Sequence, residues 1–282
     1  MELSYYPGCS LHGTAKEYDA STRAVCAALD IQLVELENWS CCGATSGHAI
    51  GGELGQALPA RNLAIAAESG RDVVVPCSAC FSRLRTAAVA HQEGKLPEGL
   101  DPIARPVEVM SLLSLFAAPE LRARLAERVQ RRLTGLSAVT YYGCLLVRPA
   151  EVTGEENIED PQGLDQLLDT LGVTVQRWNY KTLCCGGSLT LSRSDVVKRL
   201  VTKLLTAARR SKADCIVTAC PMCFANIESV QFENKDIMGA EGPLPIFYFT
   251  ELLGLALGLE KARKWIRKHL LDARPLEERR GL

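Results

Sequence analysis

Apolar residues along the chain fall into short buried runs separated by longer amphipathic segments. Short runs rich in Val, Ile, Leu and Tyr predict β-strands, and the segments between them show the apolar period of helices. In the first half this pattern predicts, in chain order, a strand at 3–6, a helix at 15–29, a strand at 31–36, a helix at 54–69, a strand at 72–75 and a strand-plus-helix unit at 107–113.

The second half repeats the same order of elements. The pattern predicts a strand at 139–142, a helix at 162–171, a strand at 173–178, a helix at 195–210, a strand at 215–218 and a strand-plus-helix unit at 246–253. Because both halves place similar elements in the same order, the chain reads as a duplicated domain.

Strands that alternate with helices indicate β-α-β units and parallel sheets. We therefore expect an α/β fold of two pseudo-symmetric Rossmann-like domains, each with a small, mostly parallel sheet flanked by helices. The expected boundaries are a first domain at 1–118, a helical linker at 119–136 and a second domain at 137–282.

Charge and hydropathy exclude several classes of partner. The net charge of -1 provides no basic field for nucleic acid or for an anionic membrane surface. No apolar run reaches the ~18 residues of a membrane span, and the first residues lack the basic and apolar regions of a secretory signal. We expect a cytoplasmic protein with no nucleic-acid partner and no membrane span.

Twelve cysteines stand out from this otherwise ordinary composition. In a reducing compartment so many thiols indicate metal binding rather than disulfides. Ten of them follow a repeated order, in which one cysteine after a strand is followed by Cys-Cys-Gly and then by Cys-x-x-Cys. They are Cys9, Cys41, Cys42, Cys77 and Cys80 in the first half, and Cys144, Cys184, Cys185, Cys220 and Cys223 in the second.

The spacing within the two arrays supports the duplication. In both halves 34 residues separate the Cys-Cys pair from the Cys-x-x-Cys motif, at 43–76 and at 186–219. Each array has cysteines directly after predicted strands, and ligands of parallel sheets collect beyond the carboxyl ends of the strands. We expect both metal sites at this rim.

The number of cysteines indicates the kind of metal site. A zinc ion or an ordinary cubane cluster takes four protein ligands, whereas each array offers five. A Cys-x-x-Cys that begins a helix places both thiolates on one face near the positive helix end, and the glycine after each Cys-Cys pair permits a turn. The arrays therefore predict clusters with a larger ligand demand than a cubane, with zinc at one or both sites as the alternative.

Several residues outside the arrays are candidates for function. His12 and His48 lie close in sequence to first-half cysteines, so either could relay a proton to a product thiolate; a structural or surface histidine is the alternative. Lys181 precedes the second Cys-Cys pair and could offset cluster charge or meet an anionic substrate, or it could be an exposed lysine. Cys26 and Cys215 lie outside the repeated order and are expected in the core.

The ten cysteines in this order resemble the cysteine-rich CCG domain, and the double array is similar to the B subunit of heterodisulfide reductase. The resemblance extends from Tyr5 to Leu253, and ferredoxin-type motifs found in some other relatives are absent. It implies a non-cubane 4Fe–4S cluster on each five-cysteine array and a disulfide substrate between the two clusters. It also implies electrons from a ferredoxin-type iron–sulfur protein like the C subunit of that family and, before that, from a flavoprotein like its A subunit.

The expected function is that of the catalytic iron–sulfur subunit of a heterodisulfide-reductase-like complex. Such an oxidoreductase would reduce a disulfide or a related sulfur substrate by one-electron delivery from two clusters. The main alternative is a non-catalytic electron-transfer subunit that links a flavin partner to another oxidoreductase, and a zinc-bound scaffold is a third possibility. The sequence does not name the sulfur substrate.

Overall fold

Each half of the chain contains one parallel β-sheet. The computed structural model describes residues 1–44, 47, 50–234, 237 and 242–282. The first sheet has the strand order β2-β1-β3-β4, and the second has the equivalent order β6-β5-β7-β8. The strands are β1 (Glu2–Tyr5), β2 (Gln32–Glu35), β3 (Val73–Val75), β4 (Val109–Ser111), β5 (Ser137–Tyr141), β6 (Thr174–Val175), β7 (Cys215–Thr218) and β8 (Ile246–Tyr248).

Every strand pair in the described part of the chain is parallel. The central strands β3 and β7 are buried along their whole length, which explains why both appear in the sequence as continuous apolar runs. The prediction of an α/β fold with two Rossmann-like units is confirmed.

Helices flank both sheets. They are α1 (Gly8–His12), α2 (Lys16–Ala28), α4 (Gly52–Glu68), α5 (Ser78–Gln92), α6 (Leu112–Ala117), α7 (Pro119–Arg128), α8 (Ala150–Thr153), α9 (Gly163–Thr170), α10 (Ser194–Arg210), α11 (Pro221–Glu233), α12 (Phe249–Ala256), α13 (Ala262–Ile266) and α14 (Arg274–Arg280), with a 3₁₀ turn, η1 (Gly187–Leu189). None of the described helices is long and apolar enough to cross a membrane.

Strand β6 is shorter than the predicted strand at 173–178. Its backbone pairing with β5 stops after Gln176, whose N–H donates to the carbonyl of Ala138. The indole N–H of Trp178 then donates to the carbonyl of Thr140 over 2.8 Å. The side chain of Trp178 thereby occupies an acceptor that a longer strand would have used.

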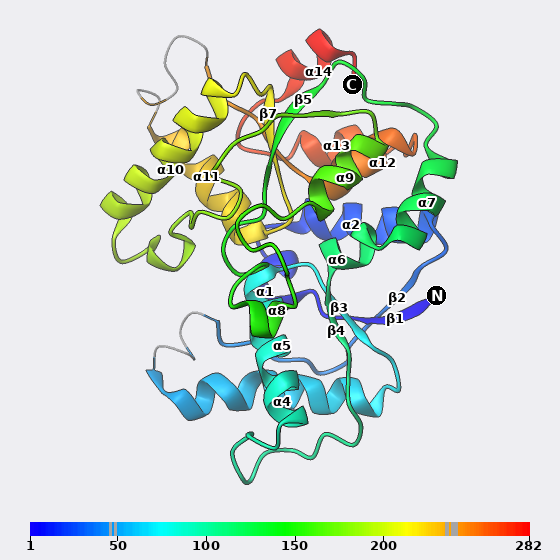
Figure 1. Cartoon of the computed structure of the whole chain (residues 1–282), viewed down its shortest axis with the longest axis vertical. Helices are drawn as coiled ribbons and strands as arrows, with labels where there is room; N and C mark the ends of the chain where they lie inside the picture. The colour runs from blue at the N-terminus through cyan, green and yellow to red at the C-terminus, as the bar shows by residue number, and fades with distance from the viewer. Residues whose placement is uncertain (45–46, 48–49, 235–236, 238–241) are drawn as a thin grey trace.

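The two halves interlock through the helices that follow their last strands. Helix α12 of the second half packs against α2 of the first half, and α6 of the first half packs against α9 of the second. Figure 1 shows α2 lying below α12 and α13 in the upper lobe, away from the lower lobe that carries α4. In the α2–α12 pair, the buried hydroxyls of Ser21 and Thr250 lie 2.7 Å apart.

The packing of α12 on the first half and of α6 on the second half bears on the predicted domain boundaries. The first sheet lies within 1–118 and the second within 137–282, while α7 lies in the predicted linker. Because each half packs the helix after its last strand on the other half, the two sheets share a continuous core. The boundaries themselves stay a prediction.

Candidate metal centres

The arrays lie at equivalent points of the two sheets. In the order β2-β1-β3-β4 the strand that follows β1 in the chain, β2, lies on one side of β1, and the next strand, β3, lies on the other side. Such a change of direction opens a crevice beyond the carboxyl ends of β1 and β3. Cys9 follows β1 and Cys77 follows β3; Cys144 and Cys220 follow β5 and β7 in the same way. Topology therefore explains why cysteines distant in sequence come together.

The Cys-x-x-Cys motifs span the starts of two helices. Cys77 is the N-cap of α5, and Cys80 is the third helical residue. Cys220 is the N-cap of α11, where Pro221 takes the first helical position. The unpaired N–H groups and the positive dipole end of each helix favour anionic sulfur at these positions.

Sulfur contacts follow the same scheme in both arrays. The Sγ atoms of Cys42 and Cys80 lie 3.3 Å apart, and those of the equivalent Cys185 and Cys223 lie 3.6 Å apart. The first cysteine of each array is a neighbour of the first member of the Cys-Cys pair, which joins Cys9 to Cys41 and Cys144 to Cys184. The structure thus brings together the five predicted cysteines of each half.

Two glycines are required by close approach to these sulfurs. Gly8 and Gly143 have φ angles of +68° and +69°, in the left-handed region that favours glycine. A Cβ atom on Gly8 would lie 2.9 Å from Sγ of Cys80, and one on Gly143 would lie 2.9 Å from Sγ of Cys223. Any other residue would push directly on a cysteine sulfur.

Two tyrosines that the sequence reasoning missed support the Cys-Cys pairs. The hydroxyl of Tyr6 donates to the carbonyl of Ser40 over 2.7 Å, and that of Tyr141 donates to the carbonyl of Leu183 over 2.6 Å. Both carbonyls belong to the residue before a Cys-Cys pair. The available signal was a tyrosine three residues before the first cysteine of each array.

Burial, followed by the charges of four surrounding cysteines, raises the pKa of Tyr6 well above its ordinary value. The same causes act on Tyr141 and raise its pKa as well. Both phenols therefore keep their protons at neutral pH. They can act as lasting hydrogen-bond donors to the turns that carry the cysteines.

The hydrogen bond between Cys42 and Cys80 lowers the pKa of Cys42 to about 7. In the second array the hydrogen bond to Cys144 lowers the pKa of Cys184 to about 6. Hydrogen bonds from Cys223 and Cys77 also lower the pKa of Cys220. Since thiolate is the form that binds metal, each array has at least one cysteine that loses its proton easily.

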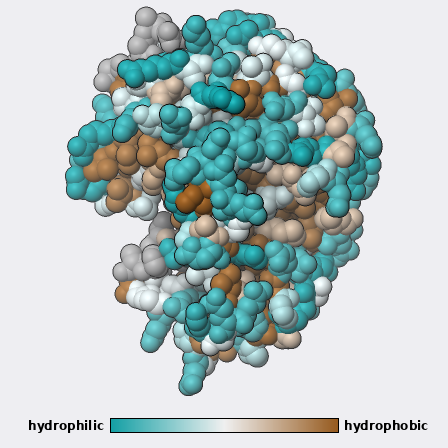
Figure 2. Space-filling view, in the orientation of Figure 1, coloured by the Kyte–Doolittle hydropathy of each residue, from teal (hydrophilic) through white to brown (hydrophobic). Residues whose placement is uncertain are grey.

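Each array has a buried side and an open side. Cys42, Cys77 and Cys80 are buried, whereas Cys9 and Cys41 are exposed. The second array repeats this division, with Cys184 exposed and Cys144 half-buried. In Figure 2 the surface is hollowed between the lobes of α10 and α4, the helices that follow the two Cys-Cys-Gly turns.

The donor set fits iron–sulfur clusters. It consists of thiols alone, and a glycine packs against a sulfur at the equivalent point of both arrays. Across the described residues, no group of three or more His, Cys, Asp or Glu side chains is arranged to hold a metal ion. Pairs of neighbouring sulfurs, in place of one compact group around a single ion, suit a cluster of several atoms.

The two arrays meet at Cys77 and Cys220. These thiols are neighbours, one from each half, and both are fully buried. Cys26 and Cys215 lie elsewhere in the core, as predicted, and burial raises the pKa of Cys26 to about 12. The two cysteines outside the repeated order are therefore packing residues of the core, apart from the ten that form the arrays.

His12 ends α1, three residues after Cys9. Its Nε2 atom lies 2.9 Å from Oε1 of Glu35, and its ring meets the edge of Trp39 at a centroid distance of 5.1 Å. The side chain is about half exposed, so solvent protons can reach it. His48 lies outside the described residues.

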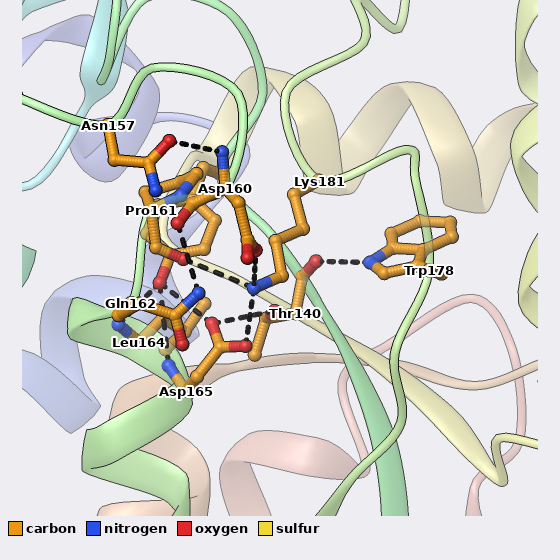
Figure 3. Close-up of polar contacts among 10 residues, drawn as sticks. Thr140, Asn157, Asp160, Pro161, Gln162, Leu164, Asp165, Trp178 and Lys181 are labelled. Atoms are coloured by element: carbon orange, nitrogen blue, oxygen red, sulfur yellow. Dashed lines mark hydrogen bonds and ion pairs between the residues drawn. The ribbon is translucent and has the colours of Figure 1, made fainter.

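Lys181 is buried, so the alternative of an exposed lysine is wrong. Its Nζ atom lies 2.6 Å from Oδ1 of both Asp160 and Asp165, as Figure 3 shows. Asp165 also accepts hydrogen bonds from the hydroxyls of Thr140 and Tyr142. The ammonium group of Lys181 is therefore paired with two carboxylates of the chain itself, whereas the sequence predicted that it could offset cluster charge or meet an anionic substrate.

The backbone of Lys181 reaches the second array directly. Its carbonyl accepts hydrogen bonds from the N–H groups of Tyr142 and Gly143, over 2.8 and 3.1 Å. Gly143 precedes Cys144, the first cysteine of the second array, and Lys181 lies three residues before Cys184. The Lys181–Asp165 ion pair thus clamps the two cysteine-bearing segments together.

Comparison with known proteins agrees with this geometry. A family model described as a cysteine-rich domain, CCG, matches residues 3–85 and 138–228. The chain belongs to the CCG family. The two matches cover one half each, and together they contain all ten cysteines of the arrays.

Relatives of this CCG protein are subunits of oxidoreductase complexes. It is 28% identical to an 8-methylmenaquinol:fumarate reductase membrane anchor subunit of Wolinella succinogenes, over 98% of this chain and 99% of that one. It is 25% identical to the B subunit of a ferredoxin/F420H2-dependent CoB-CoM heterodisulfide reductase of Methanosarcina acetivorans, over 91% and 89%. A protein of Archaeoglobus profundus that is named as like the heterodisulfide reductase B subunit is 26% identical, over 92% of each chain.

A solved structure shares the fold. It is the crystal structure of a hypothetical protein from Helicobacter pylori, with a TM-score of 0.72 and 10% identity over 94% of this chain. The CCG chain spans half the length of that protein. Together with the family match, the relatives support an iron–sulfur electron-transfer subunit of an oxidoreductase complex, and they do not support zinc.

Proposed function

We propose that this chain is the catalytic iron–sulfur subunit of a heterodisulfide-reductase-like complex and reduces a disulfide or a related sulfur substrate. The observation that carries the proposal is the meeting of two complete five-cysteine arrays at Cys77 and Cys220. Two equivalent one-electron sites that face one another suit a reaction that takes two electrons. The substrate is identified only by its sulfur–sulfur chemistry.

The residues that would hold the clusters are the ten array cysteines. A non-cubane 4Fe–4S cluster on each array, when bound, would supply one-electron transfer. The chain contributes the thiolates, the two helix N-termini that stabilise them, and the tyrosines that fix the Cys-Cys turns. The open side at Cys41 and Cys184 gives a substrate or partner access to the arrays.

Product thiolates need protons, and we propose His12 as a donor on the first-half side. It lies one helical turn from Cys9, reaches solvent, and is oriented by Glu35. For Lys181 we propose a positioning role, since Asp160 and Asp165 engage its ammonium group. His48 stays a candidate on its sequence position alone.

The proposed partners are a ferredoxin-type iron–sulfur protein like the C subunit of heterodisulfide reductase and a flavoprotein like its A subunit. The relatives named after the B subunit of that enzyme support membership of such a complex. We also propose a cytoplasmic location, because twelve cysteines without a disulfide in the described structure suit a reducing compartment.

A second function, electron transfer without catalysis, is favoured by one specific observation. The membrane anchor of the fumarate reductase aligns with this chain over nearly the full length of both. In that case the arrays would link a flavin partner to another oxidoreductase, and no sulfur substrate would be turned over.

The test begins with anaerobic purification and analysis of iron, sulfide and zinc. We expect about eight irons and little zinc per chain. Reduced viologen is then offered with a series of disulfides, and thiol release is followed. Release that disappears in Cys77→Ser but persists in Cys26→Ala, a buried cysteine outside the arrays, supports the reductase. Full iron content with no thiol release from any disulfide favours the relay, and zinc without labile sulfide would refute both.

A further inference from the structure

Tyr18 connects the two halves at the point where the arrays meet. It lies on α2 and is completely buried. Its hydroxyl donates to the carbonyl of Ala219 over 3.2 Å and to that of Pro76 over 3.4 Å. These are the residues directly before Cys220 and Cys77, the first cysteines of the two Cys-x-x-Cys motifs.

The two acceptors are equivalent positions of the repeat. Each is the last of the 34 residues between a Cys-Cys pair and a Cys-x-x-Cys motif. A tyrosine hydroxyl has a single proton, so both carbonyls share one donor. The hydroxyl of Tyr18 therefore ties together the two equivalent loops that precede Cys77 and Cys220. Neither loop can move away from the other without weakening its hydrogen bond to this hydroxyl.

The ring of Tyr18 is itself held rigidly. It stacks on Tyr248 with a centroid distance of 4.1 Å and an interplanar angle of 2°, and Tyr248 stacks in turn on Phe224 at 4.1 Å. Phe224 directly follows the ligand Cys223. On the same helix, Ser21 bonds to Thr250 of α12. The hydroxyl is thus fixed by packing from both halves, and leaving it unbonded in the core would be costly.

We propose that Tyr18 is a positioning residue that sets the distance between the two cysteine arrays, and with it the electronic coupling between the clusters they hold. It touches the backbone that precedes Cys77 and Cys220 and is not a ligand. The inference rests on a cluster in each array, as in the proposed function, and it does not depend on disulfide reduction. It applies equally to a reductase and to a relay.

The variant Tyr18→Phe keeps the ring and its stacking but removes the shared hydrogen bond. The full chain is purified anaerobically, its iron is counted, and electron paramagnetic resonance is recorded after partial and full reduction. We expect unchanged iron content and unchanged spectra of the separate clusters. The spin–spin splitting of the fully reduced protein should be lost or altered, since it depends steeply on separation.

Tyr5→Phe is the matched control. Tyr5 is also completely buried, and its hydroxyl donates to Asp19, the residue next to Tyr18 on α2, over 2.9 Å. Its loss removes a comparable tyrosine bond to the same helix without touching either Cys-x-x-Cys loop, so the splitting should match that of the wild type.

A wild-type splitting in Tyr18→Phe would overturn the proposal, as would an equal change in Tyr5→Phe. If Tyr18→Phe yields too little folded protein, Tyr248→Leu provides the second measurement. That variant removes the ring that supports Tyr18 and leaves the hydroxyl in place, so an altered splitting supports the proposal and an unaltered one refutes it. A different result would refute only the reductase function. In that case the splitting is altered in Tyr18→Phe and unaltered in Tyr5→Phe, as expected, but neither the wild type nor any variant releases thiol from a disulfide.

Discussion

The two halves build the same sulfur geometry with different supports. In the first half neutral hydrogen bonds hold the Cys-Cys turn, since the amide of Asn62 bonds to both the N–H and the carbonyl of Ser40 over 2.9 and 3.0 Å. In the second half the buried ion pair of Lys181 and Asp165 performs this task. The position equivalent to Lys181 is Asn38 in the first half, which carries no charge.

The helices after the last strands differ in the same way. In the first half Ser111 caps α6 by accepting the N–H of Ser114 over 2.9 Å. In the second half the carboxylate of Glu251 accepts the N–H of Tyr248 and lies 2.9 Å from the buried ring of His269. A duplicated fold can therefore keep its cysteine array in both copies while one copy replaces neutral contacts with buried charges.

Lys181→Met should have the largest effect, because it leaves Asp165 with an uncompensated charge at a mostly buried position. Removing one partner of a buried pair costs about 3–5 kcal/mol in the free energy of unfolding. Anaerobic denaturation measures that loss, and iron analysis should show depletion of the second array first. The exposed Lys203 offers the control Lys203→Met, and equal losses in both variants would contradict the assigned clamp.

Gly8→Ala and Gly143→Ala should come next and should match one another. Each adds a Cβ atom 2.9 Å from a cysteine sulfur at a positive φ, and strain of this kind costs about 1–3 kcal/mol. Iron content and the spectrum of the affected array should change while the other array is preserved. Gly70→Ala, at a positive φ with open space around it, separates backbone strain from the clash with sulfur.

Asn62→Ala should have a smaller effect, about 1 kcal/mol, because the lost bonds are neutral and partly reach solvent. The comparison between halves predicts loosening of the first array alone. Spectra recorded during slow oxidation should show the first cluster decaying earlier than the second. Faster decay of the second cluster would contradict the assignment of Asn62 as a support of the first array.

The smallest expected effect is a dependence of stability on pH that comes from the buried charges. Burial lowers the pKa of His269, but Glu251 outweighs it, so the net pKa is raised above the ordinary value of about 6.5. The folded state then binds the proton more tightly than the unfolded state. Its stabilisation is complete below about pH 6.5 and is lost as the pH rises through the folded pKa.

Two neighbouring carboxyls act in the same direction. Burial raises the pKa of both Glu17 and Glu228, so they too bind protons better in the folded state. The unfolding temperature should therefore fall as the pH is raised, from above about 4.5 for the two carboxyls and from above about 6.5 for His269, and His269→Gln should flatten the upper part of the curve. A curve that rises with pH would show that other groups dominate.

Much of the fold could be predicted from local pattern. The helices at 54–69 and 195–210 and the strands at 72–75 and 215–218 agree with α4, α10, β3 and β7 within a few residues, because buried parallel strands and amphipathic helices carry their period in the sequence. The strand at 173–178 was too long, because the indole of Trp178 takes a carbonyl that the ladder would have used. The hydrophobic period of the sequence does not show when a side chain competes with the backbone for a carbonyl acceptor.

The ten cysteines could be predicted as ligands for a different reason. Their spacing repeats in both halves, and the count of five exceeds what zinc or a cubane needs. The supporting residues were harder to find. The position of Lys181 before the second Cys-Cys pair marks it in the sequence, but its partners Asp165 and Asp160 lie 16 and 21 residues upstream, and nothing in the pattern pairs them with it.

The amino-acid sequence alone predicted the repeat, the parallel sheets and the ten cysteines that we propose as metal ligands, since these follow from periodicity and counting. Only the tertiary structure decided how the halves meet. Each half packs one helix, α6 or α12, on the other half, and in this arrangement Cys77 lies beside Cys220. The hydroxyl of Tyr18 then reaches the carbonyls of the residues directly before these two cysteines. Such contacts join residues up to about two hundred positions apart, where local pattern holds no information and packing alone sets the geometry.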